Sequence, residues 1–169
     1  MQKANCLQDK WRNAVFFLTA CLVVIADQLS KIWVRSNLAI GESLPETGLF
    51  RLTHVYNTGA AFGLFQDQSF LLTIVSVIGM VVLLLFILFF VRRFPFLDNR
   101  LVRSSLGLVL GGSVGNLIDR LRFGGVTDFI DVGFWPAFNI ADSAIVVGTI
   151  IFAYSLLRLG RAWKTNSSA

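Results

Sequence analysis

The chain has 169 residues, of which 55% are hydrophobic and 15% are charged, and its mean hydropathy is +0.69. This composition lies outside the range of soluble domains and indicates a single-domain membrane protein. The net charge is +5, but the basic residues lie at the ends of apolar runs without interleaved aromatics, which argues against nucleic-acid binding. The two cysteines, Cys6 and Cys21, give neither a disulfide framework nor metal-ligand spacing, so we expect them to be inert packing residues.

The first apolar run covers residues 14–34 and follows a short basic head. A basic head before such a run is also typical of a cleavable signal peptide. No small-residue cleavage pattern follows, because the run passes through Asp27 and Lys31 and then becomes apolar again. We therefore expect an uncleaved spanning helix, in which Asp27 and Lys31 share a face at i and i+4 and can pair.

A long polar connection covers residues 36–69. Its segment 49–57 is rich in β-forming and aromatic residues, which predicts a strand or small sheet lying on the membrane surface. The apolar residues 62–65 that follow are suited to the membrane interface.

Three further segments complete a predicted set of four spanning helices. Residues 70–91 carry no charge and are the clearest span. The third run reaches spanning length if it covers residues 101–121, and the fourth covers residues 139–158 after a polar loop at 122–138. The expected fold class is therefore an all-α membrane protein with a small surface sheet between helices one and two.

The third segment carries two small-residue faces. Its glycines at four-residue spacing allow another helix to approach closely in lipid. On the adjoining face, Asn116 and Arg120 stand one turn apart, so the amide and the guanidinium point the same way. Gly107, Gly111 and Gly115 form the first face, and Gly112 lies on the second face with Asn116 and Arg120.

The basic residues predict the orientation of the four helices. Ten of the fifteen lysines and arginines lie in the head, in the 92–103 loop and in the tail from Arg158 onward. By the positive-inside rule both termini are then cytoplasmic. The polar residues near the ends of the first, third and fourth helices would all fall at the outer membrane boundary.

The stretch 111–142 places four aspartates among apolar runs. Ionisable groups at bilayer depth cost roughly 2.5 to 3.5 kcal/mol each, and a cluster of them indicates a functional site. A zinc site is excluded because His54 is the only histidine. Ser113 lies in a G-x-S-x-G pattern, but the pattern falls inside the helical glycine repeat and lacks the strand-to-helix turn that a serine nucleophile needs.

Paired carboxylates remain as the candidate chemistry. Two aspartates that share a proton can activate a water and polarise a peptide carbonyl, and Asp128 and Asp142 are the candidates. Asn139 and Asp142 also have the spacing of a helix capping box, which is a purely structural alternative. A carboxylate at a helix N-terminus stays ionised more readily, which favours Asp142 as the base.

Five groups of residues, in chain order and spread over most of the chain, resemble the signature blocks of the bacterial lipoprotein signal peptidases, the signal peptidase II family. The resemblance is specific because the order and the coverage of the blocks agree together. The residues that carry it are Asp27 with Lys31; Asn57 with Gly59, Ala61 and Phe62; Gly112 with Asn116 and Arg120; Val126 with Asp128; and Phe138 with Asn139, Ala141 and Asp142.

The resemblance implies an intramembrane aspartic endopeptidase whose catalytic dyad is Asp128 and Asp142. It implies cleavage of a prolipoprotein signal peptide just before a cysteine that carries a diacylglyceryl group, and a β-cradle formed by the outer loop. Further residues are implied to support the dyad or to bind substrate: Asp27, Lys31, Asn57, Gly59, Asn116, Arg120 and Asn139.

The resemblance also implies the setting of the reaction. We expect the bacterial cytoplasmic (inner) membrane with the site near the extracytoplasmic face, a prolipoprotein and membrane lipid as partners, no cofactor or metal, inhibition by globomycin-type cyclic peptides, and a monomer. Two departures are minor. Thr127 stands where an aliphatic residue is common, and only fourteen positions separate the two aspartates.

Two other classes of function are open alternatives. A small proton-coupled carrier could use the same buried carboxylates, with Lys31 and Arg120, as proton relays. Carriers usually contain inverted repeats with broken helices, and the sequence has no internal repeat. A structural assembly protein would not need so many intramembrane charges. We interpret Asp119 and Asp131 as structural.

Overall fold

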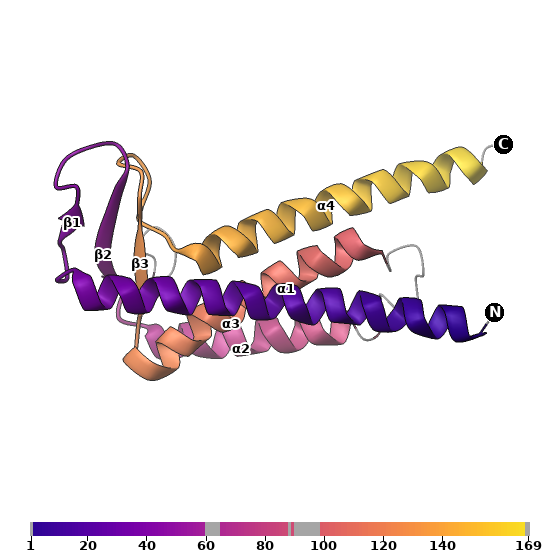
Figure 1. Cartoon of the computed structure of the whole chain (residues 1–169), viewed down its shortest axis with the longest axis horizontal. Coiled ribbons are helices and arrows are strands. Elements are labelled where there is room, and N and C mark those ends of the chain that lie inside the picture. The colour runs from indigo at the N-terminus through magenta and orange to yellow at the C-terminus, as the bar shows by residue number, and fades with distance from the viewer. Residues whose placement is uncertain (1, 60–64, 88, 90–98, 168–169) are drawn as a thin grey trace.

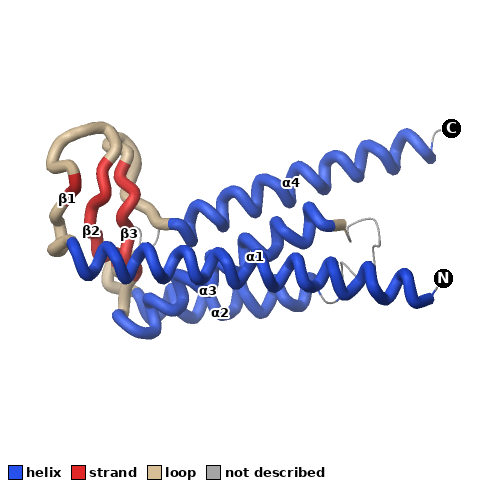
Figure 2. The backbone as a smooth tube through the Cα atoms, in the orientation of Figure 1, coloured by secondary structure: helices blue, strands red, loops and turns tan. Residues whose placement is uncertain are grey.

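A computed structural model of the chain describes residues 2–59, 65–87, 89 and 99–167. The described residues form four long helices and three strands. The helices run lengthwise, and the small sheet lies across one end of them (Figure 1). The first helix begins and the last helix ends at the opposite end (Figure 1). We call the end that carries the sheet the sheet end. The segregation of the strands to this end is plain in the tube view (Figure 2).

The four predicted spanning helices are confirmed as long apolar helices. They are α1 (Gln2–Asn37), α2 (Ser69–Phe86), α3 (Arg100–Phe123) and α4 (Ile140–Ser167). Each has the length and the composition to cross a membrane. Helix α1 begins well before residue 14, since the polar head is also helical, and α4 continues past residue 158. Residues 88, 90 and 91 of the expected second span lie outside the described residues.

The three strands form one antiparallel sheet in the order β1-β2-β3. Their bounds are Ser43–Leu44, Arg51–Asn57 and Val126–Asp131. The strand predicted within 49–57 is confirmed as β2, which begins two residues later than expected. Strand β3 is a difference from the expected fold, because it comes from the 122–138 loop and completes a sheet expected to form between α1 and α2 alone. Most of the expected interfacial stretch, 62–65, lies outside the described residues.

Strand β3 contains β-forming residues, but its pattern does not distinguish it from a loop. It has six residues, and all but Ile130 are buried, so it lacks the alternation of a half-exposed strand. Its partner β2 lies some seventy positions earlier in the chain, with Asn57 opposite Val126 and Val55 opposite Asp128. Only the tertiary pairing makes this segment a strand.

Helix α3 is the centre of the bundle and contacts the three other helices. The predicted close approach along its glycine repeat is confirmed. A Cβ atom at Gly107 would lie 2.7 Å from the carbonyl oxygen of Phe16 in α1, and one at Gly111 would lie 2.7 Å from that of Ala20. Helix α4 packs against the adjoining face, where a Cβ atom at Gly112 would collide with the backbone of Ala141. The small residues therefore bring α1 and α4 against adjoining faces of one helix, and Gly115 contacts both of them.

The turn after α3 directs the chain back across the sheet end. Gly124 ends the helix in the left-handed conformation, at φ +76°, which favours glycine. The hydroxyl group of Tyr56 donates a 2.5 Å hydrogen bond to the carbonyl oxygen of Phe123. A Cβ atom at Gly125 would lie 2.7 Å from the Tyr56 ring, so strand β2 packs directly on the turn. This contact fixes where β3 begins, two residues before Asp128.

Candidate active site

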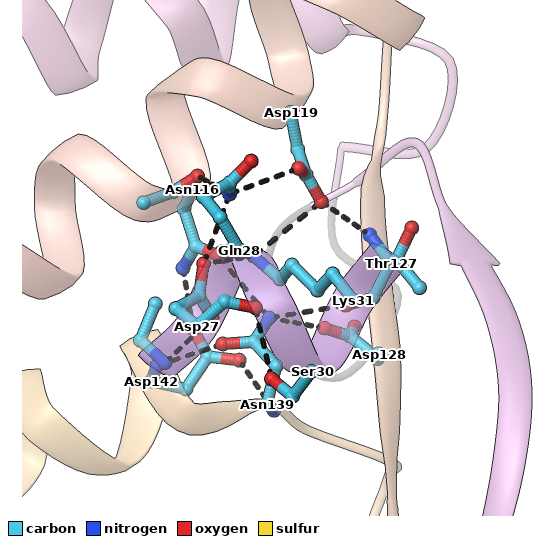
Figure 3. Close-up of polar contacts among 12 residues, drawn as sticks. Asp27, Gln28, Ser30, Lys31, Asn116, Asp119, Thr127, Asp128, Asn139 and Asp142 are labelled. Atoms are coloured by element: carbon cyan, nitrogen blue, oxygen red, sulfur yellow. Dashed lines mark hydrogen bonds and ion pairs between the residues drawn. The ribbon is translucent and has the colours of Figure 1, made fainter. Parts of the chain in front are cut away.

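The polar residues singled out in the sequence meet at the sheet end, where α1, α3, the start of α4 and β3 come together (Figure 3). They belong to segments more than a hundred residues apart in the chain. For example, the backbone N–H of Ala141 donates a 3.0 Å hydrogen bond to the Asp27 carboxylate. The buried members are connected to one another by hydrogen bonds and ion pairs.

Asp142 lies in the first turn of α4 and belongs to a reciprocal cap. The backbone N–H of Asp142 donates to the Asn139 side-chain oxygen at 2.9 Å, and the Asn139 N–H donates to Asp142 Oδ2 at 3.2 Å. Asp142 Oδ1 accepts a 2.7 Å hydrogen bond from the amide of Asn116. The capping alternative is thus correct as geometry. Both oxygens of the Asp142 carboxylate thus accept hydrogen bonds at the N-terminus of α4.

Asp128 lies in the middle of β3, and its side chain is almost fully buried. Its Oδ1 atom accepts a 2.6 Å hydrogen bond from the Asn139 amide, and its Oδ2 atom accepts one at 2.9 Å from the Asn57 amide. Burial and, second, the nearby charge of Asp142 raise the pKa of Asp128 to about 7, although both amide hydrogen bonds oppose this. Near neutral pH this carboxyl can therefore carry a proton.

The predicted pairing of Asp27 with Lys31 is confirmed. Both side chains are fully buried, and Lys31 Nζ lies 2.9 Å from Asp27 Oδ2. The ammonium group also donates to Asn116 Oδ1 at 2.9 Å and lies 3.4 Å from Asp119. All three of its N–H donors thus have acceptors. Through Asn116, the ion pair is connected to Asp142.

A cavity of about 880 Å³ opens beside the two aspartates. Its polar wall includes Asp128, Asp142 and Arg120. Its apolar wall includes three consecutive residues of α4 and an aromatic and proline-containing segment before that helix: Ile145, Val146 and Val147, with Trp135, Pro136 and Phe138. The cavity can hold an extended peptide segment beside an apolar chain.

Two of the remaining predicted residues also line this cavity. Asn57 lines it and contacts Asp128, and its side-chain oxygen accepts a hydrogen bond from the Gly59 N–H at 2.9 Å. Arg120 lies close enough to Asp142 and Asp128 to interact with their charges, but among the described residues its guanidinium makes no hydrogen bond. Its donors remain available to a molecule in the cavity.

Three contacts of this site were not predicted. Asp119, interpreted as structural, accepts hydrogen bonds from the Thr127 N–H and from the Gln28 amide. Arg35 reaches the Thr127 hydroxyl group. The available signals were spacings: Asp119 stands three residues after Asn116, and Arg35 stands four residues after Lys31, each on one helix. Gln28 and Thr127 adjoin Asp27 and Asp128 in the chain, but no spacing connects either of them with Asp119.

Two residues for which the sequence predicts no catalytic role lie apart from the cavity. Ser113 donates to the carbonyl oxygen of Val109 in its own helix and is not part of the described cavity wall. Asp131 pairs with Arg51 on the sheet, at 2.5 Å. Among the described residues, no group of three or more His, Cys, Asp or Glu side chains could hold a metal ion.

Comparison with known proteins identifies the family. The family model described as signal peptidase (SPase) II matches residues 19–158. The chain belongs to the signal peptidase II family. A "Lipoprotein signal peptidase" of Dehalococcoides mccartyi is 52% identical over 140 residues, which cover 82% of this chain and 86% of the relative. One from Moorella thermoacetica is 49% identical over 143 residues, covering 84% and 92% of the two chains.

Solved structures of bacterial membrane enzymes agree with this family. One determined by the in meso method at 2.3 Å resolution superposes with a TM-score of 0.77 at 31% identity, covering 86% of this chain and 88% of that one. Another, at 1.9 Å, gives a TM-score of 0.74, covering 85% and 93%. Signal peptidase II enzymes are membrane aspartic proteases, so this chain is an enzyme of that class. The carrier alternative has no support among these relatives.

Proposed function

We propose that this signal peptidase II cleaves the signal peptide from prolipoproteins, just before the cysteine that carries a diacylglyceryl group, and that Asp128 and Asp142 are its catalytic pair. One observation carries the assignment of the pair: both carboxyl groups line one cavity and both contact Asn139. Their environments differ in the way that an acid and a base require.

In the proposed reaction, ionised Asp142 takes a proton from a water molecule whose oxygen bonds to the scissile carbonyl carbon. Protonated Asp128 gives its proton to the carbonyl oxygen, which becomes a hydroxyl group. When the C–N bond breaks, the proton held by Asp142 passes to the leaving nitrogen, and Asp128 recovers its proton from the hydroxyl group as the carboxylic acid product forms. The pKa of Asp128, about 7, supports its role as the acid.

The cavity wall supports the proposed substrate. The apolar residues Ile145, Val146 and Val147 lie on the first turns of α4 next to Asp142, where they could pack against an acyl chain. Arg120, with five N–H donors in a planar fork, suits peptide carbonyl oxygens. A lipidated cysteine presents both features to the site at once. Globomycin-type cyclic peptides, which carry backbone carbonyls, would compete for the same cavity.

We further propose that the enzyme lies in the bacterial cytoplasmic membrane as a monomer, with both termini in the cytoplasm. The distribution of lysine and arginine supports this orientation. In this orientation the sheet end faces outward, where an exported lipoprotein precursor presents its cleavage site.

Three versions of one precursor would test the proposed substrate. Purified enzyme in lipid is incubated with a diacylglyceryl-modified precursor, with the unmodified precursor, and with a precursor whose cysteine is replaced by serine. We expect cleavage of the modified precursor alone, with mass spectrometry placing the new N-terminus at the lipidated cysteine. Equal cleavage of all three would contradict recognition of the lipid.

A further inference from the structure

We propose that Asp119 and Arg35 are positioning residues that hold strand β3 at Thr127 and thereby place the Asp128 carboxyl group. This inference rests on the proposed catalytic role of Asp128. Neither residue contacts Asp128 by a hydrogen bond within the described part of the chain, so both would act through the strand.

Asp119 holds the backbone of β3 from the side of α3. Its carboxylate is fully buried, and Oδ2 accepts a 3.0 Å hydrogen bond from the Thr127 N–H. Strand β3 is an edge strand of the sheet, with β2 on its other side. A buried N–H on such an edge needs an acceptor, and Asp119 provides it from another element. The carboxylate is itself held by Lys31 at 3.4 Å and by the Gln28 amide at 3.2 Å.

Arg35 holds the side chain of the same residue. Its Nη1 atom donates to the Thr127 hydroxyl oxygen at 2.9 Å and lies 3.5 Å from both oxygens of Asp119. The guanidinium also stacks 4.5 Å from the centre of the Phe123 ring. The planar group is thus fixed by a ring, an anion and a hydroxyl group, and its orientation is well defined.

Thr127, one position before Asp128, is therefore held by hydrogen bonds at its N–H and at its hydroxyl group. Its carbonyl oxygen lies 3.4 Å from the Asn139 amide, which also contacts Asp128. A reacting group displaced by about 1 Å can lose up to a hundredfold in rate. The described wall of the cavity includes neither Thr127, Asp119 nor Arg35. The three should thus affect turnover and leave substrate binding unchanged.

Two residues serve as matched controls. Arg122 also stacks on Phe123, at 5.3 Å, but it is exposed and makes no hydrogen bond to β3 in the described part of the chain. Asp131 lies on β3 like Asp128, but it pairs with Arg51 at the far end of the strand. Changes at these positions remove a stacked arginine or a β3 ion pair without touching Thr127.

The test measures kcat and KM for the lipidated precursor with full-length enzyme in lipid. Arg35→Gln and Thr127→Val should each lower kcat about 3- to 10-fold, the equivalent of one lost hydrogen bond. The double variant should lose no more than the more affected single variant, because both changes remove the same contact. KM should stay within about twofold, and Arg122→Gln and Asp131→Asn should retain wild-type kcat.

Asp119→Asn should lower kcat further, about 10- to 100-fold. If this variant does not fold, the decision rests on Arg35→Gln and Thr127→Val. Arg35→Gln removes a half-buried guanidinium group, and Thr127→Val conserves the shape of the side chain. Wild-type kcat in both of these, with only a lower melting temperature, would make the contacts merely structural and overturn the inference. A rise in KM at constant kcat would overturn it too, since it would indicate substrate contact.

The same assay distinguishes this inference from the proposed dyad. If Asp128→Asn is inactive while Arg35→Gln, Thr127→Val and Asp119→Asn behave as wild type, only the positioning inference fails. If Asp128→Asn remains active, the assignment of the dyad fails and the inference falls with it.

Discussion

Asn139 uses the two ends of its side-chain amide for different tasks. Its oxygen caps α4 by accepting from the Asp142 N–H, and its nitrogen donates to Asp128. The capping box and the proposed catalytic pair, which the sequence presented as alternatives, therefore share Asn139. The cap aligns the Asp142 carboxylate with the helix end, and the same residue fixes Asp128 from the opposite side.

The pH dependence of the rate should report the environment of Asp128. The proposed mechanism requires a protonated Asp128, whose pKa is about 7, so kcat/KM should fall as the pH rises through about 7. The Asn57 amide donates to Asp128 and lowers that pKa. Asn57→Ala should therefore move the alkaline limb to higher pH. A limb that stays in place or moves to lower pH would contradict the assignment of the acid.

Arg120 should be sensitive to the shape of its side chain as well as to its charge. Lysine keeps the charge but lacks the planar fork of donors. Arg120→Lys should fold normally and lose about tenfold or more in kcat/KM for the lipidated precursor. Arg122→Lys, exposed and two positions further on, should stay within about twofold of wild type. Near-normal rates in both variants would show that Arg120 only anchors the helix.

At the scale of elements, the helical parts of the site could be predicted and the strand could not. Spacing on α3 places Asn116 and Arg120 on one face, and the cap places Asn139 beside Asp142. The position of Asp128 depends on β3. This strand forms by pairing with β2, and the packing of Gly125 against Tyr56 fixes where it begins. The hydrogen bond between Asp119 and Thr127 could not be predicted for the same reason, since it joins a helix to a strand whose position the sequence does not give.

Substitutions in the glycine repeat of α3 should destabilise the protein far more than a substitution of Ser113, which lies between Gly111 and Gly115. At Gly111 a Cβ atom would already lie 2.7 Å from the Ala20 carbonyl oxygen, so Gly111→Leu forces α1 and α3 apart. We expect a loss of about 1 to 3 kcal/mol or more in stability. Among the described residues, the Ser113 hydroxyl group bonds to Val109 of its own helix and to no other element, so Ser113→Ala should change cleavage and melting temperature little. An inactive but normally folded Ser113→Ala variant would instead reopen serine chemistry.

At the scale of the whole molecule, composition and hydropathy predicted the four spans, and the basic residues predict their orientation. Reporter fusions test that orientation. A fusion after Arg161 should report the cytoplasm, and an insertion of the reporter near Glu46, in the connection between β1 and β2, should report the outside. In the structure, α1 begins and α4 ends at the end of the bundle opposite the sheet (Figure 1). If both reporters were on the same side of the membrane, the predicted topology would be contradicted.

The central claim is that Asp128 and Asp142 perform the chemistry at some cost to stability. The folded protein raises the pKa of Asp128 above the ordinary value of 3.8 to about 7. The stability gained from this shift is therefore present below about pH 4 and is lost as the pH rises through about 7. At pH 8, replacing this carboxyl group by an uncharged amide should remove a buried charge that the fold does not favour.

The most direct test combines cleavage and thermal unfolding at pH 8 for wild type, Asp128→Asn and Asp142→Asn in the same lipid. We predict that both variants lose all measurable cleavage of the lipidated precursor while Asp128→Asn melts at or above the wild-type temperature. Asp131→Asn, which breaks an ion pair on the sheet, should do the reverse, losing stability and keeping its rate. Cleavage retained by either dyad variant would contradict the account.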